Sequence, residues 1–223
     1  MGRLIAIGDT HGCIKTLDKL VNGKIGLGKT DILVMLGDYI DRGPSAREVL
    51  DFLVDLKKKG FSIITLKGNH EEMMQLAFED DNLQNAWYLN GGATTINSFA
   101  NIPREIINDV YVGFIKSMPY YHSVGPFLFV HAGFNELADD PFSDTHEMTW
   151  ECHSVYNTSF FREKVVVHGH RPKKMEVVLE ALAKNARVIP LDTGCVYKNN
   201  SDLGILSALD LDSMTLFTTE NID

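Results

Sequence analysis

The sequence predicts an α/β fold in which parallel strands alternate with helices. Short apolar runs over residues 4–7, 32–36 and 61–66 are each followed by a polar turn and then by an amphipathic segment. These units recur at roughly the 30-residue spacing that is typical of βαβ units with parallel strands. The runs are almost continuously apolar, which is typical of strands that are buried on both faces. No Pro- or Ser-rich linker divides the chain, so one domain covering residues 1–223 is expected.

Helical periodicity between the strands predicts the first helices. Apolar residues at helical spacing indicate a helix from Ile14 to Val21, which Asn22-Gly23 is expected to end. A second helix is predicted to start at Pro44-Ser45 and to stop at Gly60. A third follows the polar turn at residues 67–71 and runs through Ala77.

The second half of the chain is predicted to be less regular. Residues 82–118 indicate irregular helical structure, and the range 102–116 is expected to contain an amphipathic helix. The polar, aromatic residues 135–161 are expected to form a lid or a substrate rim. Strands over 120–124 and 127–130 flank Gly125-Pro126 and predict a β-hairpin. The remaining predicted elements are strands over 165–167, 188–191, 203–209 and 214–218 and a helix over 177–184.

Composition excludes several classes of protein. The formal net charge of -9 argues against nucleic-acid binding, which needs a basic surface. No apolar stretch approaches the ~18 residues of a membrane-spanning helix, and the N-terminus leads directly into a predicted strand with no signal peptide. The three cysteines form no C-x-x-C pair, which indicates a reduced, cytoplasmic protein. The sequence does not indicate an oligomeric state.

Polar side chains follow five of the predicted strands, at the point where each strand ends. They are Asp9 and His11, Asp38, Asn69 and His70, His131, and His168 and His170. If these strands lie in neighbouring sheets, their carboxyl ends converge on one site. Mixed oxygen and nitrogen ligands favour Mn, Fe or Zn over Ca or a structural zinc. The number of candidate ligands predicts two metals that share a bridging carboxylate, an arrangement suited to phosphoryl transfer to water.

These motifs resemble a known family. Gly8-Asp9-Thr10-His11-Gly12, residues 37–43 (GDYIDRG) and Gly68-Asn69-His70-Glu71 are similar to the three signature motifs of the phosphoprotein phosphatases, which are calcineurin-like metallophosphoesterases. His131-Ala132-Gly133 and Gly169-His170 are similar to two later histidine motifs. The resemblance implies a metallophosphoesterase βαβαβ sandwich, with two mixed β-sheets flanked by helices, as a single catalytic domain over residues 1–223. The short length resembles the bacterial and phage serine/threonine phosphatases.

The resemblance also implies a role for each motif residue. The implied cofactors are two divalent metal ions, Mn first, with Fe or Zn as alternatives. By position, the first metal would be held by Asp9, His11 and Asp38, and the second by Asp38, Asn69, His131 and His170. A hydroxide bridging the metals would attack phosphorus, and His70, oriented by Asp41, would protonate the leaving alkoxide. Arg42 and Asn69 would contact the substrate, with the Arg42 guanidinium on the phosphate oxygens.

One position departs from the family pattern. A second phosphate-binding arginine usually lies two residues after a tryptophan in the loop that follows the His-Ala-Gly motif. Here Trp150 is followed by Glu151 and Cys152, so this arginine is missing from its expected place. Either Arg162 or Arg171 replaces it, or the phosphate is held less tightly and the substrate is a different one.

Three functions are compatible with these residues. The first is a phosphatase that acts on phosphoserine or phosphothreonine in a phosphoprotein or phosphopeptide. The second is a symmetrical hydrolase of dinucleoside polyphosphates such as diadenosine tetraphosphate, whose bacterial forms often lack the aspartate at Asp41 and carry aspartate in place of Glu71. Both residues therefore favour the protein phosphatase. The third is a binding scaffold that has lost catalysis, against which the complete ligand set argues.

Overall fold

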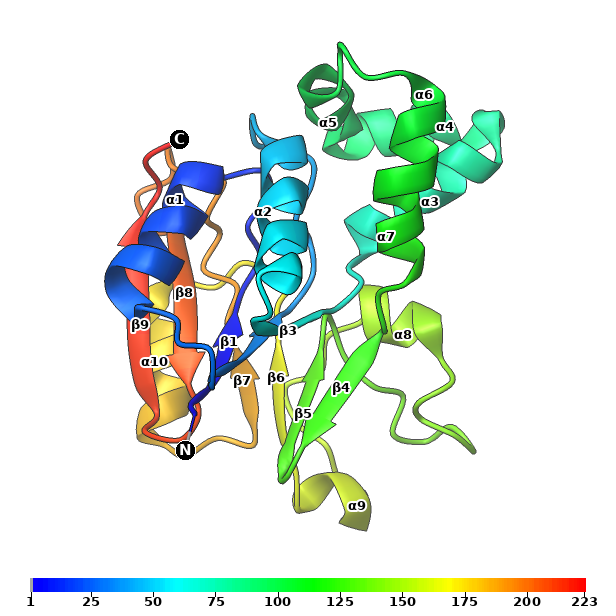
Figure 1. Cartoon of the computed structure of the whole chain (residues 1–223). Coiled ribbons are helices and arrows are strands. Elements are labelled where there is room, and N and C mark those ends of the chain that lie inside the picture. Colours follow the sequence, from blue (N-terminus) through cyan, green and yellow to red (C-terminus); the bar gives the residue numbers. More distant parts are fainter. Residues whose placement is uncertain (1) are drawn as a thin grey trace.

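Two mixed β-sheets pack against each other and are flanked by helices in the computed structural model, which describes residues 2–223 (Figure 1). The first sheet has the strand order β3-β2-β1-β8-β9. Its strands are β1 (Leu4–Ile7), β2 (Ile32–Met35), β3 (Ser62–Thr65), β8 (Ile205–Asp210) and β9 (Thr215–Glu220). The pairs of β1 with β2 and of β2 with β3 are parallel, as the βαβ spacing predicts, while β8 is antiparallel to both of its neighbours.

The second sheet has the order β4-β5-β6-β7. Its strands are β4 (Tyr121–Val124), β5 (Phe127–Val130), β6 (Val165–His168) and β7 (Val188–Pro190). The predicted hairpin is confirmed, because β4 and β5 are antiparallel around Gly125-Pro126. Strands β5, β6 and β7 are mutually parallel, so His131 and the segment after His168 leave the sheet at the same edge.

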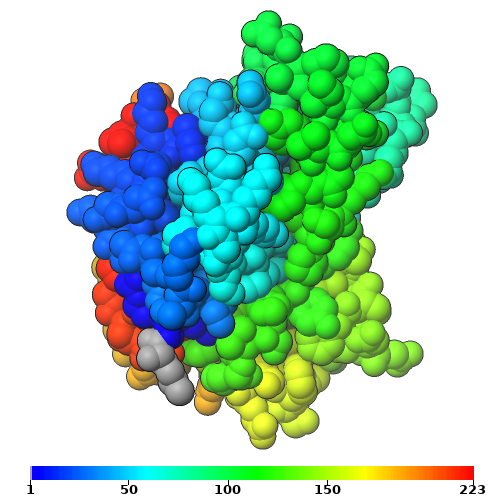
Figure 2. All heavy atoms as spheres, in the orientation of Figure 1, coloured from blue at the N-terminus to red at the C-terminus, as the bar shows by residue number. Residues whose placement is uncertain are grey.

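Helices cover the outer faces of the sandwich. The principal helices are α1 (Ile14–Asp18) with its π-helical continuation η1 (Lys19–Ile25), α2 (Ala46–Lys58), α3 (Asn69–Glu79), α8 (Thr145–Trp150), α9 (Ser159–Arg162) and α10 (Met175–Ala183). Short helical segments follow α3: η2 (Asp81–Leu83), α4 (Gln84–Trp87), η3 (Tyr88–Gly92), α5 (Ala93–Ser98), α6 (Arg104–Ile106), η4 (Ile107–Val112) and α7 (Gly113–Lys116). Figure 2 shows this last group as a projection beside α2, in green and cyan-green at the upper right. No helix within residues 2–223 has the length and apolar character needed to cross a bilayer.

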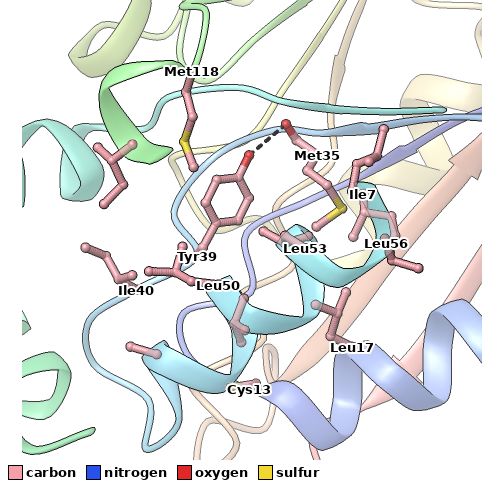
Figure 3. Close-up of a cluster of buried hydrophobic side chains, with 14 of the residues drawn as sticks. Ile7, Cys13, Leu17, Met35, Tyr39, Ile40, Leu50, Leu53, Leu56 and Met118 are labelled. Atoms are coloured by element: carbon pink, nitrogen blue, oxygen red, sulfur yellow. Dashed lines mark hydrogen bonds between the residues drawn. The ribbon is translucent and has the colours of Figure 1, made fainter. Parts of the chain in front are cut away.

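Alternate residues of each strand enter different hydrophobic layers, because successive strand side chains point to opposite faces. Ile5 and Ile7 of β1 belong to the layer under α1 and α2, which Figure 3 shows around Leu17, Leu50 and Leu53. Leu4 and Ala6, together with Phe129 and Val167 of the second sheet, form the layer between the sheets. A third layer, built around Phe134, Tyr156 and Phe161, covers the outer face of the second sheet.

One predicted helix boundary is wrong. The first helix does not end at Asn22-Gly23 but continues through Ile25, which is buried in the layer above the sheet, and stops at Gly26. Gly26 adopts φ 59°, and this left-handed conformation suits a glycine C-cap. The amphipathic helix predicted within residues 102–116 is confirmed, since α6, η4 and α7 follow one another without a break from Arg104 to Lys116.

Candidate metal centre

The five polar turns converge at one edge of the sandwich, where β1, β2, β3, β5 and β6 end. The backbone of these turns is unusual. Seven non-glycine residues among those described have positive φ, and five of them are candidate site residues: His11, Asp38, Asp41, Arg42 and His170. Such conformations are uncommon outside glycine and concentrate at functional sites. The fold therefore holds strained turns where the sequence predicts the site.

Asp38 lies at the centre of the site. Its Oδ2 is 3.4 Å from His11 Nε2 and 3.9 Å from His70 Nε2, and its Oδ1 is 3.4 Å from His131 Nε2. Ligand atoms of Asp38, His11 and His70 form one group close enough to hold a metal ion. The two Asp38 oxygens thus face different histidines, as a bridging carboxylate requires.

A second group forms on the other side of Asp38. Ligand atoms of Asp38, His131 and His170 also lie close enough to hold an ion. Asn69 Oδ1 is 3.1 Å from His131 Nε2 and 3.2 Å from His170 Nδ1, and these two ring nitrogens are 3.2 Å apart. Four side chains from both sheets therefore point donor atoms at one small volume.

Asp9 lies beside these groups, although its oxygens belong to neither. Its Oδ2 accepts a hydrogen bond from the His170 backbone N–H at 2.9 Å, while its buried Oδ1 has no hydrogen-bond partner. A Cβ atom on Gly169 would come within 2.1 Å of Oδ1, so this glycine leaves the oxygen its space. An unpartnered buried carboxylate oxygen is unfavourable unless a cation or a donor satisfies it.

Burial fixes the charge states of the ligands. Burial lowers the pKa values of His11 and His131 well below the usual range and lowers the pKa of His170 to about 4. These imidazoles are neutral and keep the lone pair that a metal needs. Burial raises the pKa of Asp38 well above its usual range, and nearby Glu71 adds to this effect. Burial opposes ionisation of the carboxylates, and a divalent cation would stabilise their negative charge. A site of neutral histidines and such carboxylates therefore suits divalent cations.

His70 makes a different contact from the other histidines. Its Nδ1 lies 2.7 Å from Asp41 Oδ2, and both side chains are buried. Asp41 also accepts hydrogen bonds from Trp87 Nε1 at 2.8 and 3.1 Å and from Thr95 Oγ1 at 2.6 Å. Burial raises the pKa of Asp41 to about 7, against the lowering effect of the bonds from Thr95 and Trp87. With Nδ1 held by the carboxylate, the Nε2 of His70 is directed to the Asp38 side of the site.

Sequence reasoning missed Trp87, Thr95 and Glu71 as parts of the site. Glu71 is fully buried and accepts hydrogen bonds from the backbone N–H groups of Asp38, Tyr39 and Gly68. It thereby joins the turn after β2 to the start of α3. Its place in the Gly-Asn-His-Glu motif is a signal that could have revealed this role. Trp87 and Thr95 lie in the irregular helical region, where no sequence pattern marks them.

Arg42 is exposed, and its Nη1 lies 2.8 Å from His11 Nε2, at the mouth of the first group. Of the two candidates for the missing arginine, Arg162 is excluded by its position. It ends α9, which precedes the amino end of β6 and lies beside the β4–β5 turn, away from the site (Figure 1). Arg171 directly follows His170, and its Nη2 is 3.6 Å from Glu151 Oε2. The Trp150 and His170 rings are 6.1 Å apart, so this end of the predicted rim reaches the site.

The fold and the two groups of candidate ligands that share Asp38 are compatible with a metal-dependent phosphoesterase. The sequence profile described as "Calcineurin-like phosphoesterase" matches residues 2–202, and this chain belongs to that family. The resemblance inferred from the motifs is thereby confirmed, as are the α/β class and the two mixed sheets. Members of the family use a dinuclear metal centre.

Relatives include enzymes named for dinucleoside polyphosphates and enzymes named as protein phosphatases. "Bis(5'-nucleosyl)-tetraphosphatase PrpE [asymmetrical]" of Oceanobacillus iheyensis is 26% identical over 220 residues, which cover 86% of this chain and 84% of the relative. "Serine/threonine-protein phosphatase 2" of Escherichia coli is 40% identical over 86 residues, which cover 39% of this chain and 37% of that protein.

Solved structures show the same fold. A structure described as a putative diadenosine tetraphosphatase has a TM-score of 0.66 at 19% identity and covers 100% of this chain and 95% of its own. A serine/threonine phosphatase from Saccharomyces cerevisiae has a TM-score of 0.71 at 16% identity and covers 100% of this chain and 81% of its own.

Proposed function

We propose that this protein is a metal-dependent hydrolase of dinucleoside polyphosphates. The main support for this proposal is the length of the chain over which it is similar to relatives of this kind. Three relatives named asymmetrical bis(5'-nucleosyl)-tetraphosphatase each match 86% of this chain, whereas similarity to the E. coli protein phosphatase is limited to 39% of it. A short match shows that motifs are shared, while a match along the chain includes the loops and helices that surround the substrate. The presence of Asp41 argues only against a symmetrical hydrolase, whose bacterial forms often lack this aspartate. It does not oppose an asymmetrical enzyme.

The proposed metal ligands remain those of the motif assignment. Asp9, His11 and Asp38 would hold one ion, and Asp38, Asn69, His131 and His170 the other. The unpartnered Oδ1 of Asp9 and the neutral imidazoles support this assignment. Mn, Fe and Zn all suit this mixture of oxygen and nitrogen donors. When bound, such a pair supplies a nucleophilic water and neutralises charge on the phosphoryl group.

The chain's own residues would perform the remaining work. Arg42, exposed at the mouth of the site, would donate hydrogen bonds to the phosphoryl oxygens. His70 Nε2 would hold the proton that the leaving oxygen receives when the ring is doubly protonated, and the Asp41 carboxylate, which accepts from Nδ1, would orient the ring and stabilise that cation. The same contact between imidazole and carboxylate also occurs in metal-binding histidines. His70→Asn that keeps its bound metal but loses turnover would support the acid role, and loss of metal from that variant would refute it.

A specific observation favours a second candidate, which is hydrolysis of phosphoserine or phosphothreonine in proteins. The buried contact between His70 and Asp41 builds a proton donor, and a serine alkoxide needs protonation far more than a nucleoside phosphate does. The 40% identity over 86 residues to the E. coli enzyme agrees with this candidate.

Substrate comparison separates the two candidates. The purified protein, stripped with chelator and reloaded with Mn²⁺, is assayed for kcat/KM on diadenosine tetraphosphate and on a phosphothreonine peptide. The proposal expects preference for the dinucleotide, with ATP and AMP as products if cleavage is asymmetrical and ADP alone if it is symmetrical. Preference for the peptide would instead establish the second candidate. Protein that binds none of Mn, Fe or Zn would be a scaffold.

Two further expectations belong to this proposal. The three free cysteines, Cys13, Cys152 and Cys195, support a cytoplasmic location. The organisation as one catalytic domain over residues 1–223 also stays a prediction, supported by the absence of any linker-like segment in the sequence.

A further inference from the structure

A cavity of about 560 Å³ lies between the segment of Cys152 to Ser154, strands β6 and β7, and α10. Its wall begins at His168 and Arg171, which flank Gly169 and the proposed ligand His170. It continues along α10 through Val177, Glu180, Ala181 and Lys184, whose spacing places them on one face of that helix. The volume lies within the range of small-molecule sites. A substrate with its phosphoryl group at the metals could therefore extend into this cavity.

The charged side chains that line the cavity indicate which kind of ligand it would bind. Arg171, Lys173 and Lys184 line it in a chain whose net charge is -9, and Glu180 is the only carboxylate among its lining residues. Lys184 pairs with Glu180 and Arg171 lies near Glu151, but Lys173 has no salt-bridge partner within residues 2–223. Arg171 and Lys173, which follow His170 in the chain, favour an anionic ligand at this end of the cavity.

His168 adds a polar group of a different kind. It is 4% exposed and lines the cavity. Its Nδ1 lies 3.0 Å from Gly169 O, and because a carbonyl only accepts, Nδ1 carries the hydrogen and donates it. Nε2 is then a lone-pair acceptor, and it makes no hydrogen bond within the part of the chain that the structure describes. A ligand with a hydroxyl or amino donor would satisfy it.

The rest of the wall is mostly apolar, with His153 and Ser154 as further polar residues. Val177, Ala181, Val188 and Pro190 contribute hydrophobic surface between α10 and β7. A flat apolar group such as a nucleobase gains by burial against such a surface. Cations, one buried acceptor and an apolar wall are together the features that a nucleotide requires, whereas inorganic phosphate would use only the first.

We infer that this cavity binds one nucleoside monophosphate unit of the substrate, with its phosphate at Lys173 and Arg171 and its base against Val177 and Ala181. The inference rests on the proposed function, which it deepens by giving the nucleotide a site separate from the metals.

The test fills the cavity without altering the metal centre. Ala181→Trp places a large ring on the apolar wall, and Leu179→Trp is the matched control on the same helix, since Leu179 is 50% exposed and does not line the cavity. Lys173→Glu reverses the charge as a second variant. Each Mn²⁺-loaded protein is assayed on diadenosine tetraphosphate and on p-nitrophenyl phosphate, which has no nucleotide, and AMP binding is measured by calorimetry.

Ala181→Trp and Lys173→Glu are expected to raise KM for the dinucleotide and Kd for AMP by roughly tenfold or more, as loss of a main contact region predicts. Their kcat/KM on p-nitrophenyl phosphate should stay within about twofold of wild type, which also shows that they fold. Unchanged KM and Kd in both variants would overturn the inference while leaving the proposed function intact. A wild-type protein that binds AMP in a variant-sensitive way but does not cleave the dinucleotide would overturn the proposed function and leave the nucleotide site standing.

Discussion

Replacing Trp87 by phenylalanine tests whether a residue outside the motifs controls the acid–base pair. The indole N–H donates to both oxygens of Asp41, which is fully buried and also holds His70. Phenylalanine keeps most of the ring volume and removes only the donor. We therefore expect little loss of packing and a specific change at the carboxylate.

The structure gives the size of this change. A hydrogen bond to a charged group contributes about 1.5–3 kcal/mol, and one pKa unit corresponds to about 1.4 kcal/mol. Since burial already raises the pKa of Asp41 to about 7, Trp87→Phe should raise this pKa by roughly one to two units. Most Asp41 side chains would then be protonated at neutral pH, and a protonated carboxyl no longer stabilises the imidazolium that donates the proton. Turnover should fall roughly tenfold on a substrate with a poor leaving group.

The assay compares phenyl phosphate with p-nitrophenyl phosphate over a pH series. Trp87→Phe should lose much more activity on phenyl phosphate, and the loss should shrink as pH rises through the raised pKa, because deprotonation restores the carboxylate. Tyr88→Phe is the control, since Tyr88 is exposed and its hydroxyl makes no hydrogen bond within residues 2–223. Equal losses on both substrates, or a loss that does not vary with pH, would refute a role for Trp87 through Asp41.

Three other predictions concern metal binding and stability. Gly169→Ala should lower metal content and activity severalfold without unfolding the protein, because its Cβ would meet Asp9 Oδ1 at 2.1 Å, and metal analysis alongside circular dichroism checks this. Asp38→Asn should reduce the bound metal itself, and full metal occupancy in that variant would exclude a bridging role. The hydrogen bond from Arg3 lowers the pKa of Asp31 in the folded protein to about 2, whereas its pKa in the unfolded chain is near 4. The pair therefore stabilises the fold at pH values above about 4, and this contribution is lost as the pH falls toward 2. Asp31→Asn should therefore lower the free energy of unfolding by about 1–2 kcal/mol at pH 7 but hardly at pH 2, as denaturant titrations would show.

Local sequence patterns were sufficient to predict the position of a site residue where that residue directly follows its own strand. Asp38 and His131 follow continuous apolar runs, so their position at a sheet edge could be predicted, and the structure brings them within 3.4 Å. The hairpin around Gly125-Pro126 was predictable for the same reason. The motifs also indicated the family before any geometry was known.

Contacts between distant segments could not be predicted in this way. Trp87 and Thr95 reach Asp41 from 46 and 54 residues away, through helices whose packing no local periodicity describes. The first helix passes Asn22-Gly23 because burial of Ile25 outweighs the local turn signal. Arg162 was a candidate to replace the missing arginine because it lies near Trp150 in the sequence. It lies at the amino end of β6, away from the site, and sequence proximity does not indicate which end of a strand a residue occupies.

The central claim is that the converged turns form a two-metal hydrolytic centre, and metal titration tests it most directly. Chelator-stripped protein is titrated with Mn²⁺ while bound metal and diadenosine tetraphosphate cleavage are measured on the same samples. The account predicts about two ions per chain and activity that rises only as the second ion binds. Full activity in the stripped protein, or saturation at one ion per chain, would contradict it.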